Sequence, residues 1–181
     1  MKHAWILLLC TISTATTIDD AVEWSEPVNG LRARLLVLPA KPGEAPFCRV
    51  MIEMENVSDN GGQKRIRFHP DKLKLRVVDQ DGQELPSANG SYDGMSPDWE
   101  PLLLPYGGTL RFPFDLRGLG YRPEDKAIID IGPPHVWVIP QDGAVYRLEG
   151  EFTVKKEPRD HRHKDWSGTL KLPPVEIPTG K

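Results

Sequence analysis

One stretch of the chain, from Phe47 to Asp59, alternates apolar and mostly charged residues with a period of two. The apolar positions are Cys48, Val50, Ile52 and Met54, and the alternate positions are Arg49, Met51, Glu53 and Glu55. Because successive side chains of a β-strand point to opposite faces, this alternation predicts a strand with one apolar and one polar face. Such a strand fits a sheet that packs against a core on one side and faces water on the other.

Similar alternation recurs along most of the remaining sequence. Further strands are expected around 31–37, 66–68, 73–77, 110–114, 128–131, 135–139, 146–154 and 169–172. Pro113 makes its strand an edge strand or a short one, and Pro173-Pro174 interrupts the last strand before Val175. Trp137 lies within an apolar strand and is expected in the core. The pattern predicts an all-β fold, an antiparallel immunoglobulin-like β-sandwich of about seven to nine strands.

The N-terminus has the layout of a secretory signal peptide. A lysine and a histidine precede the apolar run from Ala4 to Cys10, and small and polar residues follow it. The run is too short to cross a bilayer as a helix. Small residues at Ser13 and Ala15 predict cleavage after Ala15. We expect a signal peptide over 1–15, a flexible lead-in over 16–22 and one domain over 23–178, secreted or periplasmic and without a stable membrane span.

Charge and cysteine content narrow the classes of function. The formal net charge is −3, and basic residues are interleaved with acidic ones, so nucleic acid is not expected as a partner. Once Cys10 leaves with the signal peptide, Cys48 is the remaining cysteine and no intrachain disulfide can form. Its place on the apolar face of a strand predicts a buried, inert thiol.

Four pieces of the sequence resemble bacterial exported Ig-like β-sandwich domains, in particular the family of the intracellular proteinase inhibitor. These pieces are Val50 to Ser58, Leu73 to Gly82, Leu104 to Leu110 and Gly143 to Gly150. The aromatic stretch that the family carries in its middle loop is matched only in part, by Asp98-Trp99-Glu100. The resemblance implies the sandwich fold and, less directly, inhibition of a proteinase.

The segment from Gln83 to Pro105 has no sustained period, and connections of this length in a compact domain are usually functional or disordered. In and next to it lie Tyr92, Trp99 and Tyr106. Loop aromatics can form a platform for a peptide or a sugar, and they can also plug the end of a sandwich. The leading hypothesis is a non-enzymatic binding module for another extracytoplasmic protein or a glycan. The alternative is a proteinase inhibitor that acts through 83–105.

Catalytic and metal-binding chemistry have few candidates. The segment from Asp160 to Asp165 contains His161 and His163, which could share a divalent ion with a third ligand from elsewhere. Neighbouring basic residues oppose this, and a solvated loop is the simpler interpretation, so metal binding is the second alternative. No catalytic constellation is evident, and neither an enzyme nor a cofactor is expected. Asn56-Val57-Ser58 fits the acceptor pattern for N-glycosylation in a eukaryotic secretory pathway.

Overall fold

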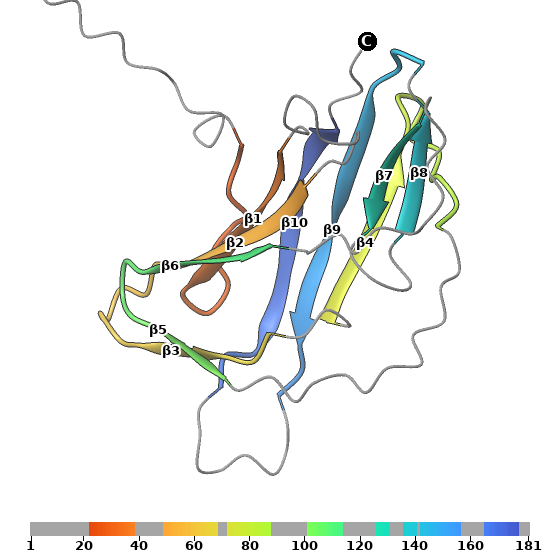
Figure 1. The fold of residues 1–181 in the computed structure, drawn as a ribbon. Helices are drawn as coiled ribbons and strands as arrows, with labels where there is room; N and C mark the ends of the chain where they lie inside the picture. The colour runs from red at the N-terminus through yellow and green to blue at the C-terminus, as the bar shows by residue number, and fades with distance from the viewer. Residues whose placement is uncertain are drawn as a thin grey trace, which may run out of the picture.

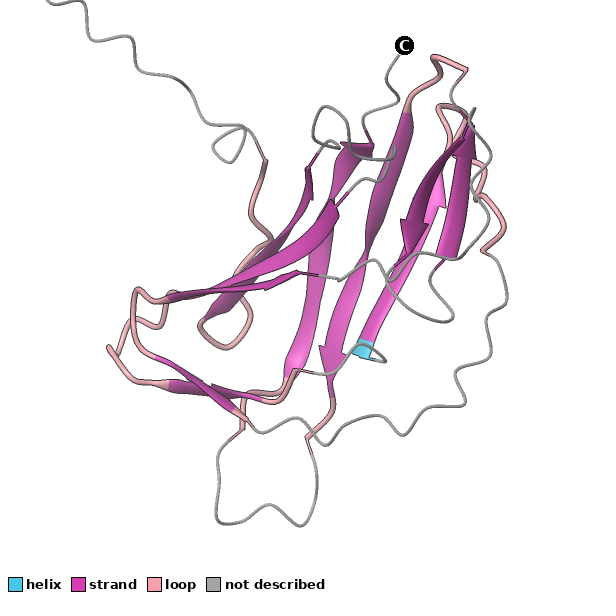
Figure 2. Cartoon of the chain, viewed as in Figure 1, coloured by secondary structure: helices cyan, strands magenta, loops and turns pink. Residues whose placement is uncertain are grey.

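The computed structural model describes residues 22–38, 49–68, 72–87, 101–113, 126–130, 136–140, 142–156 and 165–177. They form ten β-strands: β1 (Leu31–Leu38), β2 (Arg49–Asn56), β3 (Lys64–Ile66), β4 (Leu73–Val78), β5 (Leu102–Leu104), β6 (Thr109–Pro113), β7 (Lys126–Asp130), β8 (Val136–Pro140), β9 (Tyr146–Val154) and β10 (Gly168–Ile177). Within these ranges, helical conformation is limited to Lys72, at the start of β4 (Figure 2). The all-β prediction is confirmed.

The strand pairs are antiparallel throughout the described sheets. Two three-stranded sheets have the orders β1-β2-β6 and β10-β9-β4, and two-stranded sheets pair β3 with β5 and β7 with β8 (Figure 1). The expected number of seven to nine strands is wrong, because the described residues form ten strands and β5 was not predicted. Three consecutive leucines form this strand, and they carry no alternation from which it could be recognised.

A row of stacked aromatic rings joins the two three-stranded sheets through a shared core. Phe112 of β6 stacks on Phe68 with 3.9 Å between ring centroids, and Phe68 stacks on Phe152 of β9 at 5.5 Å. Phe152 in turn stacks on Trp166 at 5.9 Å. Trp137 of β8 is buried in the same core, as expected. Burial of these large side chains supplies much of the apolar area that stabilises the fold.

Three prolines lie in strands at places where the missing N–H group removes no central hydrogen bond of a sheet. Pro113 is in β6, which is an edge strand of its sheet, as its sequence predicts. The pairing of β10 with β9 shifts register between Leu172 and Val175. Pro173 and Pro174 therefore occupy a β-bulge, and β10 continues to Ile177 on the other side of it.

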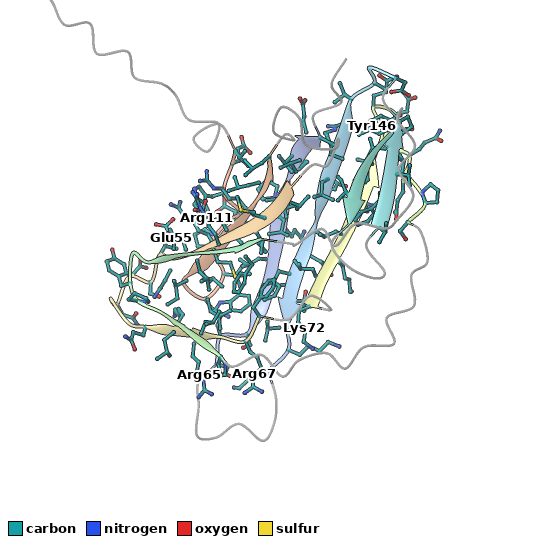
Figure 3. All side chains as sticks on the ribbon, in the orientation of Figure 1. Glu55, Arg65, Arg67, Lys72, Arg111 and Tyr146 are labelled. Atoms are coloured by element: carbon teal, nitrogen blue, oxygen red, sulfur yellow. The ribbon has the colours of Figure 1, made fainter. Side chains whose placement is uncertain are left out.

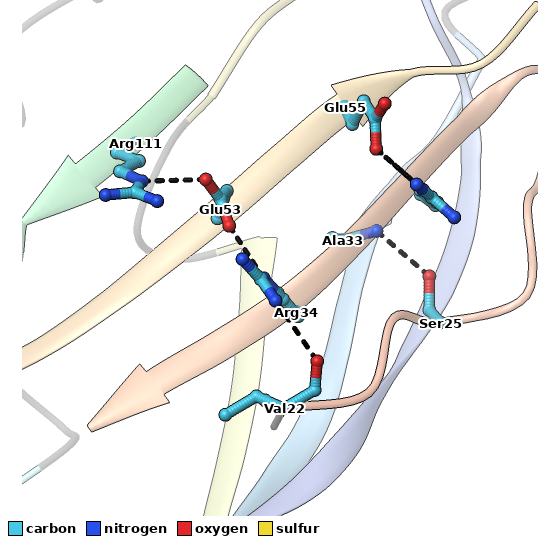
Figure 4. Close-up of polar contacts among 8 residues, drawn as sticks. Val22, Ser25, Ala33, Arg34, Glu53, Glu55 and Arg111 are labelled. Carbon is cyan, nitrogen blue, oxygen red and sulfur yellow. Dashed lines mark hydrogen bonds and ion pairs between the residues drawn. The ribbon is translucent and has the colours of Figure 1, made fainter. Parts of the chain in front are cut away.

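The outer face of β1-β2-β6 is covered in part by the chain that precedes β1. Residues 22–27, here called the N-terminal strap, place Trp24 over the guanidinium of Arg34 at 4.4 Å and donate the backbone N–H of Ser25 to Ala33. Arg34 pairs with Glu53 at 2.6 Å, and Glu53 also pairs with Arg111 (Figure 4). The side chain of Glu53 is only 4% exposed. The expectation that this face of β2 meets water is therefore wrong at Glu53.

The turn into β9 is held by a carboxylate. Asp142 accepts the backbone N–H of Ala144 and the hydroxyl of Tyr146, each at 2.9 Å. These two bonds, the backbone bond first, lower the pKa of Asp142 from its usual 3.8. Burial, then the hydrogen bond to Asp142, raises the pKa of Tyr146 from its usual 10.0. The turn therefore stabilises the fold above the unfolded-state pKa of Asp142 and below that of Tyr146.

The variant Tyr146→Phe should raise the pKa of Asp142 only part of the way to its usual value, because the Ala144 bond remains. Stability should then decline less steeply as the pH falls through the pKa of Asp142, and the alkaline loss due to Tyr146 should vanish. NMR titration of the Asp142 carboxyl and urea midpoints against pH measure both effects. Tyr106→Phe is the control, and an Asp142 pKa that is the same in wild type and Tyr146→Phe would contradict this account of the turn.

Candidate functional site

Two large apolar side chains are exposed on the segment that contains β5 and the turn after it. Leu103 is 63% exposed and Tyr106 is 60% exposed. The sequence leaves two roles open for Tyr106, recognition of a partner and plugging the end of the sandwich, and its exposure is inconsistent with the plugging role. Leu103 was not expected, since an apolar residue in a leucine run is ordinarily assigned to the core. Leu103 and Tyr106 together are called the β5 surface below; Tyr92 and Trp99 lie outside the described residues.

The side chain of Asn56, at the end of β2, fixes this segment from inside. Asn56 is fully buried, and its amide group donates to the carbonyls of Gly62 at 2.8 Å and Leu104 at 2.9 Å. Its backbone N–H donates to Gly108 at 3.1 Å, and its carbonyl accepts from Gly107 at 2.9 Å. Both ends of the turn that carries Tyr106 are thus bound to one residue. Because β-strand side chains alternate and Leu104 is buried, Leu103 points outward.

The interpretation of Asn56 as a glycan acceptor does not fit the folded chain. Its amide nitrogen makes two hydrogen bonds, and its side-chain oxygen accepts from the backbone N–H and the hydroxyl of Ser58. The oxygen thus forms an Asx-type turn, which is the local reason that β2 ends here. Asn56 is a structural residue that positions the β5 surface.

The free edge of β5 is poorly suited to pairing with another strand. Arg65 of β3 lies opposite Leu103 and directs its carbonyl to the N–H of Trp166, at 2.7 Å. Arg65 and Leu103 therefore form a non-hydrogen-bonded pair, and the backbone groups of Leu103 face away from β3. Pro101 and Pro105, the next residues with that orientation, have no N–H to offer. Between 101 and 105, a partner strand would find an N–H group on this edge at Leu103 alone, so it would mainly meet the side chains of the β5 surface.

A basic cluster lies beside Leu103. The carboxylate of Asp165 pairs with Arg65 at 3.1 Å and with Arg67 at 3.4 Å, and Figure 3 places both arginines at the same end of the molecule. The Arg67 side chain is 51% exposed, against 24% for Arg65 and 16% for Asp165. Arg65, Arg67 and Asp165 are called the β3 cluster. Two cations share one carboxylate there, which leaves a positive charge next to an exposed leucine.

The metal-binding alternative receives no support from the described part of its segment. Asp165 is held by two arginines, which compete with any cation for its carboxylate. Across the ranges that the structure describes, no three His, Cys, Asp or Glu side chains come together as a metal site. His161 and His163 lie outside these ranges, as does Cys48.

Two shallow hollows on the surface lack the converging polar groups of a small-molecule site. The first, of about 490 Å³, lies over β4, β9 and β10, where Arg76 pairs with Glu149 at 2.6 Å and Lys74 with Glu151 at 3.3 Å. Its charged groups thus neutralise one another. The second, of about 450 Å³, is lined by Ser58 among others, whose hydroxyl is already bound to Asn56.

In comparisons with known proteins, no family model, curated protein or solved structure matches the chain. Among the residues described, no helix has the length and apolar character needed to cross a membrane. Function therefore has to be inferred from the surface of the molecule itself.

The variant Asn56→Asp should lower the free energy of unfolding by about 3 kcal/mol, because it places a buried carboxylate against two carbonyl oxygens and removes both donated bonds. Hydrogen exchange at Gly107 should accelerate with it. Asn60→Asp is the matched control, since exposed Asn60 uses only its side-chain oxygen, as the acceptor for the N–H of Gly62. Urea unfolding of the two variants measures the difference, and equal stabilities would show that Asn56 does not hold the segment.

Proposed function

We propose that this chain is an exported, non-enzymatic β-sandwich of the immunoglobulin-like type that binds another extracytoplasmic protein. Two antiparallel three-stranded sheets with a common aromatic core support the sandwich. The layout of the first 15 residues supports export. A glycan is the other class of partner that aromatic side chains on a surface would fit.

The observation that carries the proposal is the β5 surface. Leu103 is 63% exposed and Tyr106 is 60% exposed, although their segment is held in place by the buried Asn56. Apolar side chains presented on a fixed backbone lose little conformational entropy when a partner covers them. Tyrosine is also enriched at protein interfaces, because it combines a large apolar ring with a hydroxyl that can reach water or a polar partner.

The double variant Leu103→Ser/Tyr106→Ser should capture its partner at least about tenfold less well than wild type, since buried anchors supply most interface energy. Immobilised protein would be exposed to secreted and envelope fractions of its source, and each captured protein would be quantified. Val138→Ser/Val145→Ser, at two exposed valines away from β5, is the matched control. Unchanged capture by the Leu103/Tyr106 variant would rule out the β5 surface. Tyr92→Ala and Trp99→Ala test the remaining aromatic residues.

One observation favours a second function, inhibition of a proteinase through the segment 83–105. Leu103 is exposed in an extended strand between Pro101 and Pro105, which is the conformation in which proteinases bind a substrate-like segment. Micromolar protein should then inhibit at least one enzyme in a panel of serine and cysteine proteinases, and Leu103→Ser should abolish the effect while Val145→Ser does not. A panel in which every enzyme stays fully active would remove this function.

A further inference from the structure

The β3 cluster and Leu103 of the β5 surface lie on one face of the β3-β5 pair. Arg65 and Leu103 are directly opposite in the antiparallel pair of β3 and β5, so their side chains lie on the same side of the sheet. Arg67 is two residues beyond Arg65, and its contact with Asp165 keeps its guanidinium beside that of Arg65. This face therefore combines an exposed apolar side chain with two guanidinium groups.

Among the residues that the structure describes, the charge on this face is only partly neutralised. Asp165 supplies one carboxylate for two guanidinium groups, and its separation from Arg67, 3.4 Å, is longer than a charge-assisted hydrogen bond. Half of the Arg67 side chain remains exposed. A guanidinium has five N–H donors in a planar fork, so Arg67 retains the capacity to bind a second carboxylate.

A similar arrangement occurs on another sheet, where Arg34 and Arg111 share the carboxylate of Glu53. There the N-terminal strap lays Trp24 over Arg34, whose side chain is 9% exposed, while that of Arg111 is 47% exposed. Each place therefore has one covered and one half-exposed arginine. The half-exposed Arg111 lies 2.7 Å from its carboxylate, whereas Arg67 lies 3.4 Å from Asp165. A carboxylate of a partner would complete the pairing of Arg67.

We propose that Arg67 and Leu103 form the specificity-determining part of the docking surface, and that they select a protein segment with a carboxylate next to an apolar side chain. The carboxylate pairs with Arg67, the apolar side chain packs on Leu103, and Asp165 acts as an internal competitor for the arginines. This inference rests on the proposed binding function and names the chemistry of the partner. A protein is favoured over an anionic membrane because the described part of this segment exposes two large apolar side chains, too few to anchor a lipid surface.

Random peptides displayed on phage, selected on the full chain, test the inference. Selected sequences should be enriched in Asp or Glu beside Leu, Ile or Phe. Synthetic versions should bind Arg67→Gln about fivefold more weakly than wild type, and the difference should shrink as salt rises. Asp165→Asn should bind them more tightly, because it removes the internal competitor. Lys171→Gln, which loses an exposed charge on another sheet, should leave affinity unchanged.

Several results would overturn the inference. They are selection without acidic enrichment, equal affinity of wild type and Arg67→Gln, and tighter binding to phosphatidylglycerol vesicles than to the selected peptides. Loss of binding in Leu103→Ser/Tyr106→Ser but not in Arg67→Gln would retain the binding function and reject the acidic partner. Loss in neither variant would reject both. Melting temperatures within the range of wild type confirm that the variants are folded, as expected for a half-exposed arginine.

Discussion

The buried amide of Asn56 is the interaction on which the functional surface depends. Its side-chain nitrogen donates to the carbonyls of Gly62 and Leu104, and its backbone bonds to Gly107 and Gly108 at the far end of the turn that follows β5. In an interior without water, each of these groups would otherwise be left unpaired at a cost of about 1–3 kcal/mol. The network therefore favours a single arrangement in which β2, β5 and β6 meet, and in which Leu103 lies outside the core.

The two faces of the sheets differ in the interactions that they make. Inside, the stacked rings of Phe112, Phe68 and Phe152 bring the two three-stranded sheets into one core. Outside, carboxylates pair with basic side chains on adjacent strands, as Glu53 does with Arg34. Exposed pairs of this kind contribute little stability, and the buried one offsets a desolvation cost. The core thus stabilises the fold, while the charges limit which surfaces can associate.

Local periodicity explains which parts of the fold could be predicted from the sequence. A period of two can be recognised from neighbouring residues alone. The bounds of β9 could therefore be predicted from the sequence, and so could the apolar face of β2, whose Val50, Ile52 and Met54 are fully buried. β5 has no such period, and its existence depends on pairing with a distant β3. The burial of Glu53 likewise accompanies ion pairs with Arg34 and Arg111, which are distant from it in the sequence. Tyr106 could be recognised in the sequence as an aromatic residue beside a glycine turn. The exposure of Leu103 could not, because it follows from the buried hydrogen bonds of Asn56. In the sequence, Asn56 looks like an ordinary turn-forming residue.

The two places where a pair of arginines shares one carboxylate differ in how closely the more exposed arginine is paired, and this difference favours the β3 cluster as the place where another molecule binds. The half-exposed Arg111 lies 2.7 Å from the carboxylate of Glu53, which leaves little for another anion to gain there. At Arg67 the guanidinium is half exposed and its carboxylate is distant, so desolvating it with a matching anion costs less than desolvating a fully paired one. Leu103 contributes apolar contact beside the charge, and contact of that kind excludes water from an ion pair and strengthens it. A partner with only a carboxylate, or only an apolar side chain, would satisfy one half of this face and leave the other half exposed.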